Sequence, residues 1–165
     1  MYHAIVARKT RAIFAAINRG DPGPMLDALS SRFRYRFEGA TCLGGERTTR
    51  EAMERWWARL YRLFPETKFE VRDVLVSGWP WSTRIATYLA FRANLPTIGP
   101  YENVVVQMVR MRWGRIDEIH TLEDSLRCWR TLQVLAEQGN TEANAAPIAD
   151  RDREVLSSEP FAHPA

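Results

Sequence analysis

Acid–base chemistry near neutral pH points first to His120, because histidine alone has an unperturbed side-chain pKa in that range. The other two histidines, His3 and His163, lie at the ends of the chain. Glu123 and Asp124 follow His120 closely, and either carboxylate could orient its ring, so these three residues are candidates for a general base or acid. Two plainer interpretations stay open: a histidine bonded to backbone or water, and an aspartate that caps a helix.

Tyr35 is the candidate donor to negative charge that develops on a substrate. It lies in segment 32–37, where arginines alternate strictly with aromatic residues, so Phe33, Tyr35 and Phe37 share one face of a predicted strand. A phenol in an apolar site can donate a hydrogen bond to an oxyanion while a carboxylate abstracts a proton beside a carbonyl group. Tyr35 therefore completes the set of candidate catalytic residues.

Six side chains are candidates for contact with a ligand. Asn103 and Gln107 share a face of a predicted strand, which would bind a carbonyl or hydroxyl group if it points inward, or a partner chain if it points outward. The same alternatives apply to Tyr88, and aromatic rings suit a flat apolar ligand. The ligand-contact candidates are Phe37, Trp57, Trp81, Tyr88, Asn103 and Gln107.

Metal and cofactor chemistry has no support in the sequence. The two cysteines, Cys42 and Cys128, lie far apart and no regular Cys/His spacing accompanies them, so we expect no disulfide framework, no metal and no cofactor. The net charge of +3 is a mild excess, and the arginine-rich segments read as solvated faces. Nucleic acid is therefore not an expected partner.

Membrane insertion is also not expected. The sequence contains no run of about eighteen apolar residues, the length that a membrane-spanning helix needs. Arg8, Lys9 and Arg11 interrupt the first apolar stretch, which argues against a signal segment. We expect no membrane partner and a cytoplasmic location.

Hydrophobic periodicity predicts helices followed by a long strand meander. A helix over 3–19 ends at Gly20, and Thr48-Thr49-Arg50-Glu51 has the form of a capping box before a helix that ends at Pro65. The remaining predicted elements are a short helix over 25–29, strands over 32–37, 67–78, 82–94, 101–113 and 115–123, and a last helix over 125–138.

One domain is expected over residues 1–139, of the α+β class, with helices packed on one face of a curved antiparallel sheet. Such a sheet can leave an apolar cavity at its open end. Residues 140–165 carry three prolines and few large apolar side chains, so we expect a partly disordered C-terminal tail. Removal of residues 146–165 should then leave the melting temperature almost unchanged.

The predicted strand over 101–113 is apolar on both faces. Helices cover only one of these faces, so the other is expected to be buried against a second copy in an isologous dimer. The residues behind this expectation are Val104, Val105, Val106, Met108 and Val109.

Several short motifs recur in an order found in one known superfamily. They are Ala16-Ile17-Asn18-Arg19-Gly20-Asp21, the aromatic strand over 33–37, the helix after Gly44-Gly45, and Trp113-Gly114-Arg115-Ile116-Asp117-Glu118-Ile119-His120. Over residues 3–138 the chain resembles the nuclear transport factor 2-like superfamily, in its SnoaL-like and ketosteroid isomerase-like branch.

The resemblance implies a cone-shaped fold, a homodimer through the sheet, and a pocket for a small apolar or polycyclic ligand. It implies a cofactor-independent isomerase, dehydratase or cyclase, or alternatively a non-catalytic ligand-binding or dimerisation module. Dehydratases of this fold use a His–Asp pair, which agrees with a role for His120. Epoxide hydrolases of the superfamily carry an aspartate where this chain has Thr121, which disfavours that activity.

Overall fold

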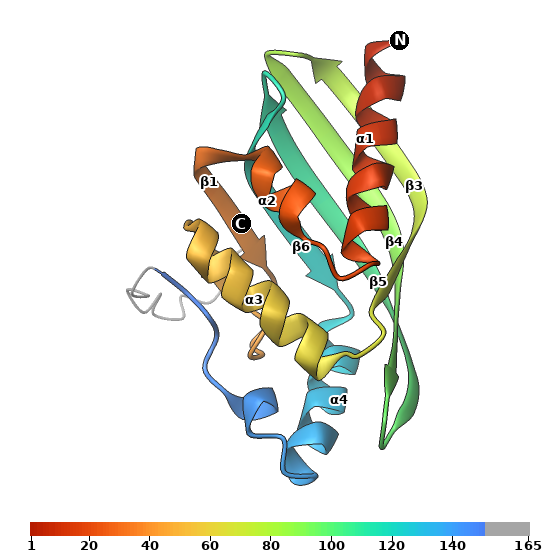
Figure 1. The fold of residues 1–165 in the computed structure, drawn as a ribbon, viewed down its shortest axis with the longest axis vertical. Coiled ribbons are helices and arrows are strands. Elements are labelled where there is room, and N and C mark those ends of the chain that lie inside the picture. The colour runs from red at the N-terminus through yellow and green to blue at the C-terminus, as the bar shows by residue number, and fades with distance from the viewer. Residues whose placement is uncertain (151–165) are drawn as a thin grey trace, which may run out of the picture.

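The structure, a computed structural model, describes residues 1–150. Its four α-helices and five of its six strands follow the predicted order, and the sixth is a short strand in the loop before the third helix (Figure 1). The elements are α1 (Tyr2–Ile17), α2 (Gly23–Ala28), β1 (Leu29–Phe37), β2 (Gly45–Arg47), α3 (Arg50–Leu63), β3 (Lys68–Trp79), β4 (Ser82–Leu95), β5 (Gly99–Arg112), β6 (Arg115–Glu123), α4 (Ser125–Glu137) and the 3₁₀-helix η1 (Thr141–Asn144).

The strands form one sheet in the order β2-β1-β6-β5-β4-β3. The long strands β3 to β6 pair antiparallel, as consecutive hairpins do, whereas β1 pairs parallel with β6. The sheet is therefore mixed rather than purely antiparallel. The parallel pair arises because the chain leaves β1, crosses through α3, and returns by the long meander before β6 is laid beside β1.

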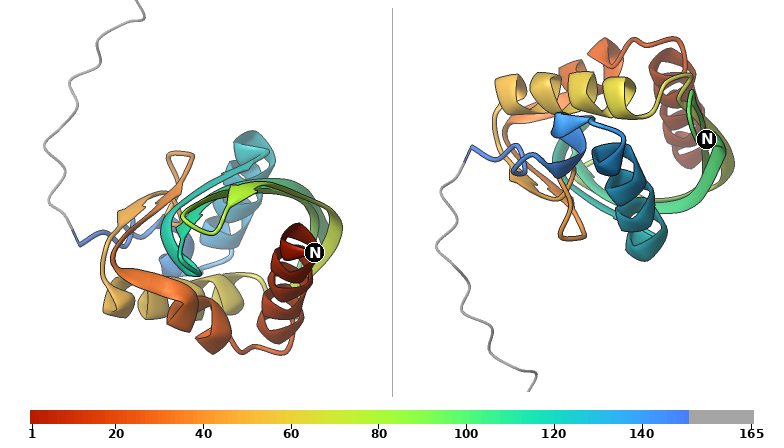
Figure 2. Two further views of the ribbon diagram at one scale, coloured as in Figure 1. Left: turned by 90° about the horizontal axis from the view of Figure 1, so that it is seen from above. Right: turned by 90° about the horizontal axis from the view of Figure 1, so that it is seen from below.

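The sheet curls around α1 and α3, which lie on its concave side (Figure 2). Inward positions alternate along the strands, as the period of a strand requires. On β4 these are Ile85, Leu89 and Phe91, and on β5 Val105 and Val109. The cone expected from the sequence is thus built, with its core between the sheet and the two helices.

The N-terminus of α3 is capped both by a local residue and by one that is distant in the sequence. Thr49 is the N-cap, and its hydroxyl oxygen accepts a hydrogen bond from the backbone N–H of Ala52 at 3.3 Å. In a capping box the reciprocal carboxylate comes from the third residue of the helix. Here Asp150 supplies it, because its carboxylate accepts from the backbone N–H groups of Thr48 and Thr49. The cap therefore lies one residue later than predicted, without Glu51.

The first part of the expected tail packs on the domain. Glu142, in η1, pairs with Arg62 at 2.6 Å and with Arg59 at 3.4 Å. Arg59 also donates to the backbone oxygen of Ala146 at 2.8 Å, and Asp150 follows at the start of α3. Residues 140–150 thus belong to the folded body, while the rest of the expected tail, 151–165, lies outside the described residues.

The centre of the convex face of the sheet carries exposed apolar side chains. Five of them are each about two-fifths exposed, a high fraction for residues of this type at the centre of a sheet. They are Tyr88, Val104, Val106, Met108 and Leu122. Among residues 1–150, no helix is long and apolar enough to cross a membrane.

Candidate functional site

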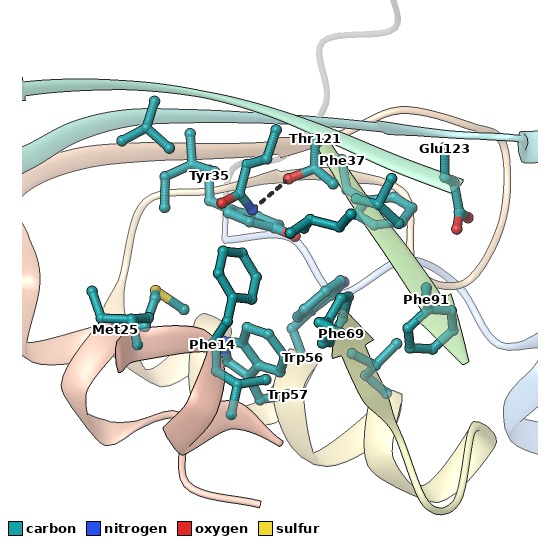
Figure 3. A pocket seen from close by; sticks show the side chains of 18 of the residues that line it. Phe14, Met25, Tyr35, Phe37, Trp56, Trp57, Phe69, Phe91, Thr121 and Glu123 are labelled. Carbon is teal, nitrogen blue, oxygen red and sulfur yellow. Dashed lines mark hydrogen bonds between the residues drawn. The ribbon is translucent and has the colours of Figure 1, made fainter. Parts of the chain in front are cut away.

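A cavity of about 70 Å³ lies inside the cone, between the concave face of the sheet and the helices α1 and α3 (Figure 3). Its walls are mainly aromatic and aliphatic, because the inward positions of every long element meet here. The aromatic lining consists of Phe14, Tyr35, Phe37, Trp56, Trp57, Phe64, Phe69 and Phe91.

Polar atoms reach the cavity from β5 and β6. The Gln107 amide donates to the Thr121 hydroxyl at 3.1 Å, and both side chains line the cavity. Tyr35 lies on the neighbouring strand β1 and is almost fully buried. Burial raises the pKa of Tyr35 well above its ordinary value, which nearby Arg47 and Thr121 only partly oppose, so its phenol is neutral and able to donate.

Glu123, the last residue of β6, is the acidic group of the cavity. Its Oε2 accepts from the Asn103 amide at 3.0 Å, and the thiol of Cys128 lies close enough to the carboxyl group to lower its pKa. Its Oε1 is sealed from solvent and has no hydrogen-bond partner among the described residues. Burial raises the pKa of Glu123 from about 4.5 to about 7, an effect that Asp124 reinforces and that Cys128 and Asn103 partly oppose.

Asn103 holds this carboxyl group in place. Its amide nitrogen lies 2.9 Å from the Tyr101 hydroxyl, in addition to its bond to Glu123, and its carbonyl oxygen accepts from the backbone N–H of Val104 at 2.8 Å. Asn103 is itself buried. The orientation of Glu123 is therefore set by a small network at the end of the cone that α4 closes (Figure 2).

His120 lies outside the cavity, which corrects the expected pairing of this residue with Glu123. Side chains alternate along β6, so Ile119 and Thr121 point inward and His120 points outward. The His120 Nε2 lies 2.7 Å from the Glu38 Oε1, at the surface. His120 thus bonds a surface carboxylate, rather than the backbone or water of the plainer interpretation, and it does not line the cavity.

Asp124 is also placed away from the cavity chemistry. Its side chain accepts from the backbone N–H of Arg127 at 3.0 Å and caps the N-terminus of α4. Of the ligand-contact candidates, Phe37, Trp57 and Gln107 line the cavity, and Asn103 contacts Glu123 behind its wall. The other two do not line it: Trp81 lies in the β3–β4 turn and Tyr88 on the convex face.

Arg47 is the functional neighbour that sequence reasoning missed. It is fully buried, and its guanidinium donates to the backbone oxygens of Leu43 at 2.8 Å and Gly45 at 3.2 Å. The same group lies 5.5 Å from the centre of the Tyr35 ring and 5.4 Å from that of Trp56. Burial lowers the pKa of Arg47 to about 10, so it is still charged at neutral pH. A charged residue in a short glycine-rich loop gives no sign of burial in the sequence.

Thr121 was also missed as a contact, although period-two alternation in β6 could have identified it. Ile119, Thr121 and Glu123 are spaced by two residues and share the inward face. Within residues 1–150, no group of three or more His, Cys, Asp or Glu side chains could hold a metal ion. The expected lack of a metal stays a prediction.

Comparison with known proteins gives the family. The model of the SnoaL-like domain family matches residues 10–119. Among curated proteins, no relative matches the sequence.

Solved structures share the fold at low sequence identity. PrhC from Penicillium brasilianum NBRC 6234 is similar with a TM-score of 0.72 and 15% identity, over 87% of this chain and 96% of PrhC. IdmH from Streptomyces antibioticus, described as a candidate polyketide cyclase, has a TM-score of 0.61 and 20% identity, over 77% of this chain and 97% of IdmH. TerC co-crystallised with polyporic acid has a TM-score of 0.63 and 12% identity, over 73% of this chain and 92% of TerC.

The matched family covers two thirds of the chain, including the second half of α1, all of α3 and most of the sheet. The chain therefore belongs to the SnoaL-like domain family and has the nuclear transport factor 2-like, ketosteroid isomerase-like fold.

Proposed function

We propose that this protein binds a small, largely apolar molecule in the cone cavity and carries out a cofactor-independent acid–base step on it with Glu123. One observation carries the proposal. The Glu123 carboxyl group lines an aromatic cavity and its Oε1 is buried without a hydrogen-bond partner among the described residues, an unusual state for which a catalytic role is one physical reason.

The acidity of Glu123 suits proton transfer in either direction. A carboxyl group with a pKa of about 7 is partly protonated and partly ionised at neutral pH, so it can accept a proton and return it. Thr121 lies two residues away on the same face, a distance of about 6.6 Å between Cα atoms. With Gln107 and Tyr35, Thr121 offers hydrogen bonds for an oxygen atom of the ligand.

The matching reaction is proton abstraction beside a carbonyl group. The ionised Glu123 takes a proton from the carbon next to the carbonyl, the electron pair forms a carbon–carbon double bond, and the carbonyl oxygen gains negative charge. Neutral donors near that oxygen stabilise the charge, as the phenol of Tyr35 can. Return of the proton to another carbon completes an isomerisation, whereas return to the same carbon is only hydrogen exchange. In a dehydration the enolate instead expels hydroxide, which takes the proton from Glu123 and leaves as water.

The names of two similar structures support this class of ligand. IdmH is described as a candidate polyketide cyclase, and TerC was crystallised with polyporic acid. The cavity of about 70 Å³ is smaller than the apolar cavity of about 150 Å³ that holds benzene in an engineered protein. Even a ligand with one ring therefore requires some movement of the walls, and a polycyclic ligand requires more, so a one-ring ligand is the first choice.

The proposal includes a homodimer through the convex face of the sheet. This face carries five exposed apolar side chains at its centre, including Tyr88, Val106 and Met108, and a second copy would bury them.

The experiment is hydrogen–deuterium exchange at the carbon beside the carbonyl of cyclohexanone, 1-indanone and 1-tetralone, followed by NMR in heavy water. Glu123→Gln should slow the protein-catalysed exchange by about 10²–10⁴-fold, because the shape is kept and the titrating group is lost. His120→Gln is the matched control and should exchange at the wild-type rate. Equal rates for wild type and Glu123→Gln would contradict the proposal, and ketone binding without exchange in the wild type would leave the non-catalytic ligand-binding alternative.

A further inference from the structure

Three tryptophans form an exposed cluster at one end of the molecule. Trp79 ends β3, Trp81 lies in the β3–β4 turn and Trp113 in the β5–β6 turn, and they are 63%, 54% and 73% exposed. The rings of Trp79 and Trp81 are stacked, with centroids 5.9 Å apart, and Trp81 lies 6.2 Å from Trp113. Large apolar rings gathered in this way on a surface mark a site of interaction.

The cluster is rigidly built. The backbone N–H of Trp113 donates to the backbone oxygen of Pro80 at 2.6 Å and ties the two turns together. The ring of His3, at the start of α1, lies 2.7 Å from the backbone oxygen of Gly78. The three indole rings therefore sit on a braced platform rather than on independent loops.

Trp113 has a left-handed backbone conformation that tryptophan seldom adopts. Its φ is 50° and that of Gly114 is 79°, so the two residues form a two-residue hairpin turn. Asn, Asp or Gly is preferred at the first position of such a turn. A bulky residue there carries strain, and strain persists mostly where a side chain has a task. The backbone strain at this turn thus accompanies a Trp113 ring that is almost three-quarters exposed.

The position of the cluster suits a flat partner. Both turns lie with the N-terminus of α1 at one end of the long axis, the upper end in Figure 1. The rings project from hairpin tips and do not line the cavity. A projecting tip meets a surface more readily than it encloses a small molecule.

The charges around the cluster are basic. Residues 78–84 and 112–116 contain Arg84, Arg112 and Arg115 and no acidic residue. Arg112 pairs with the carboxylate of Asp117 at 2.5 Å. Arg115 donates to the backbone oxygen of Asp27, a contact that does not neutralise the charge of Arg115. The tip therefore combines indole rings with positive charge.

We infer that this tryptophan tip docks on the surface of an anionic phospholipid bilayer. Indole rings favour the headgroup region, where the apolar ring is buried and the N–H still finds an acceptor. Arginines beside them attract the negative surface of the lipid. Docking would be peripheral, since no helix among residues 1–150 can span a membrane, and it departs from the expectation from composition that the protein has no membrane partner.

The test is co-flotation of the full chain with vesicles of phosphatidylcholine containing one third phosphatidylserine, with tryptophan emission recorded in parallel. The wild type should float with these vesicles and shift its emission to the blue. The triple variant Trp79→Ser, Trp81→Ser, Trp113→Asn should partition at least about tenfold more weakly, and Arg115→Gln about fivefold more weakly. Because Asn suits the turn at position 113, the triple variant should keep its fold, which circular dichroism checks.

Trp129→Ser is the matched control, because Trp129 is also half-exposed but lies on α4. It should float like the wild type. Failure of the wild type to float, equal flotation of the triple variant, or an equal loss with Trp129→Ser would overturn the inference. A tip that pairs two copies instead would appear in light scattering without lipid as self-association that only the triple variant loses, and this too would overturn it.

Discussion

Glu123 combines two properties that a surface glutamate lacks. Its Oε2 is held by Asn103, while its Oε1 is buried without a partner at the cavity wall. Removal of the carboxylate from water destabilises the charged form, and for this reason its pKa rises to about 7. The same property that suits Glu123 to proton transfer must also make the stability of the fold depend on pH.

The sign of that dependence follows from the raised pKa. Below about pH 4 both the folded and the unfolded chain hold the proton, so Glu123 adds no pH-dependent term. Between about pH 4.5 and 7 the unfolded chain releases it and the folded chain keeps it, so the free energy of unfolding falls, by at most about 3 kcal/mol in total. Urea unfolding should show Glu123→Gln gaining stability relative to wild type across this interval.

Glu38→Gln is the control with the opposite sign. Although burial alone would raise it, the pKa of Glu38 is lowered by its bond to His120 and by the charge of Arg36. The Glu38→Gln variant should therefore lose stability relative to wild type as the pH rises to about 4.5, and the deficit should stay constant above that pH. Parallel curves for Glu123→Gln and wild type would contradict the assignment of Glu123.

Arg47 makes a second prediction at the residue scale. Arg47→Met keeps much of the volume but removes the guanidinium donor from the backbone oxygens of Gly44 and Gly45, whereas that of Leu43 keeps its bond from the Trp56 indole N–H. We expect a loss of about 2 kcal/mol or more, which lowers Tm by roughly 5 °C. Arg32→Met, at an exposed position of β1, should change Tm little. An unchanged Tm for Arg47→Met would contradict this prediction. It would show that the free-energy cost of burying the guanidinium equals the stabilisation from its hydrogen bonds.

Residue types alone gave only part of the site. Alternation in the aromatic strand correctly indicated that Tyr35 and Phe37 share an inward face, and the sequence also named Gln107 and Glu123. The prediction that Glu123 orients the His120 ring was wrong, because residues three apart on a strand lie on opposite faces. The buried charge of Arg47 depends on tertiary contacts of a loop, which no local pattern encodes.

At the scale of elements, α3 depends on a residue about a hundred positions away. The Asp150 carboxylate accepts from the N-cap N–H and its neighbour, the role that sequence reasoning gave to Glu51. Asp150→Ala should cost about 1 kcal/mol and lower Tm by roughly 2–4 °C. Glu137→Ala, at the exposed end of α4, is the control and should not lower Tm. No change with Asp150→Ala would mean that solvent replaces the cap.

The same contacts revise the expected effect of truncation. Removal of residues 146–165 deletes the Asp150 cap and the backbone oxygen that Arg59 bonds. We therefore expect a fall in Tm of at least the size seen with Asp150→Ala, rather than almost none. A calorimetric scan of the truncated chain decides between the two expectations.

Period and capping signals were enough to predict most elements. The strands and helices have nearly the predicted bounds because each buries one face. That burial appears in the sequence as apolar residues at every second position in strands and at a 3.6-residue period in helices. The parallel pairing of β1 with β6 and the short strand β2 were not predicted. Both depend on where distant segments meet, and a three-residue strand is too short to show a period.

At the scale of the whole molecule, the convex face predicts assembly. We expect the wild type to sediment as a dimer, and Val106→Lys to sediment as a monomer of about 19 kDa, because a charge at the centre of an apolar interface is left unpaired. Leu126→Lys, at an exposed position on α4, should remain dimeric. A monomeric wild type at micromolar concentration would contradict the dimer.

The central claim is that one buried carboxyl group meets the ligand inside the cone. A pH titration of the glutamate side chains by carbon-detected NMR, with and without cyclohexanone, tests it most directly. We predict one carboxyl resonance that titrates near pH 7, is absent from Glu123→Gln, and shifts its midpoint when the ketone binds. Titration of every glutamate below about pH 5, persistence of the late resonance in Glu123→Gln, or a midpoint that ignores the ketone would contradict the claim.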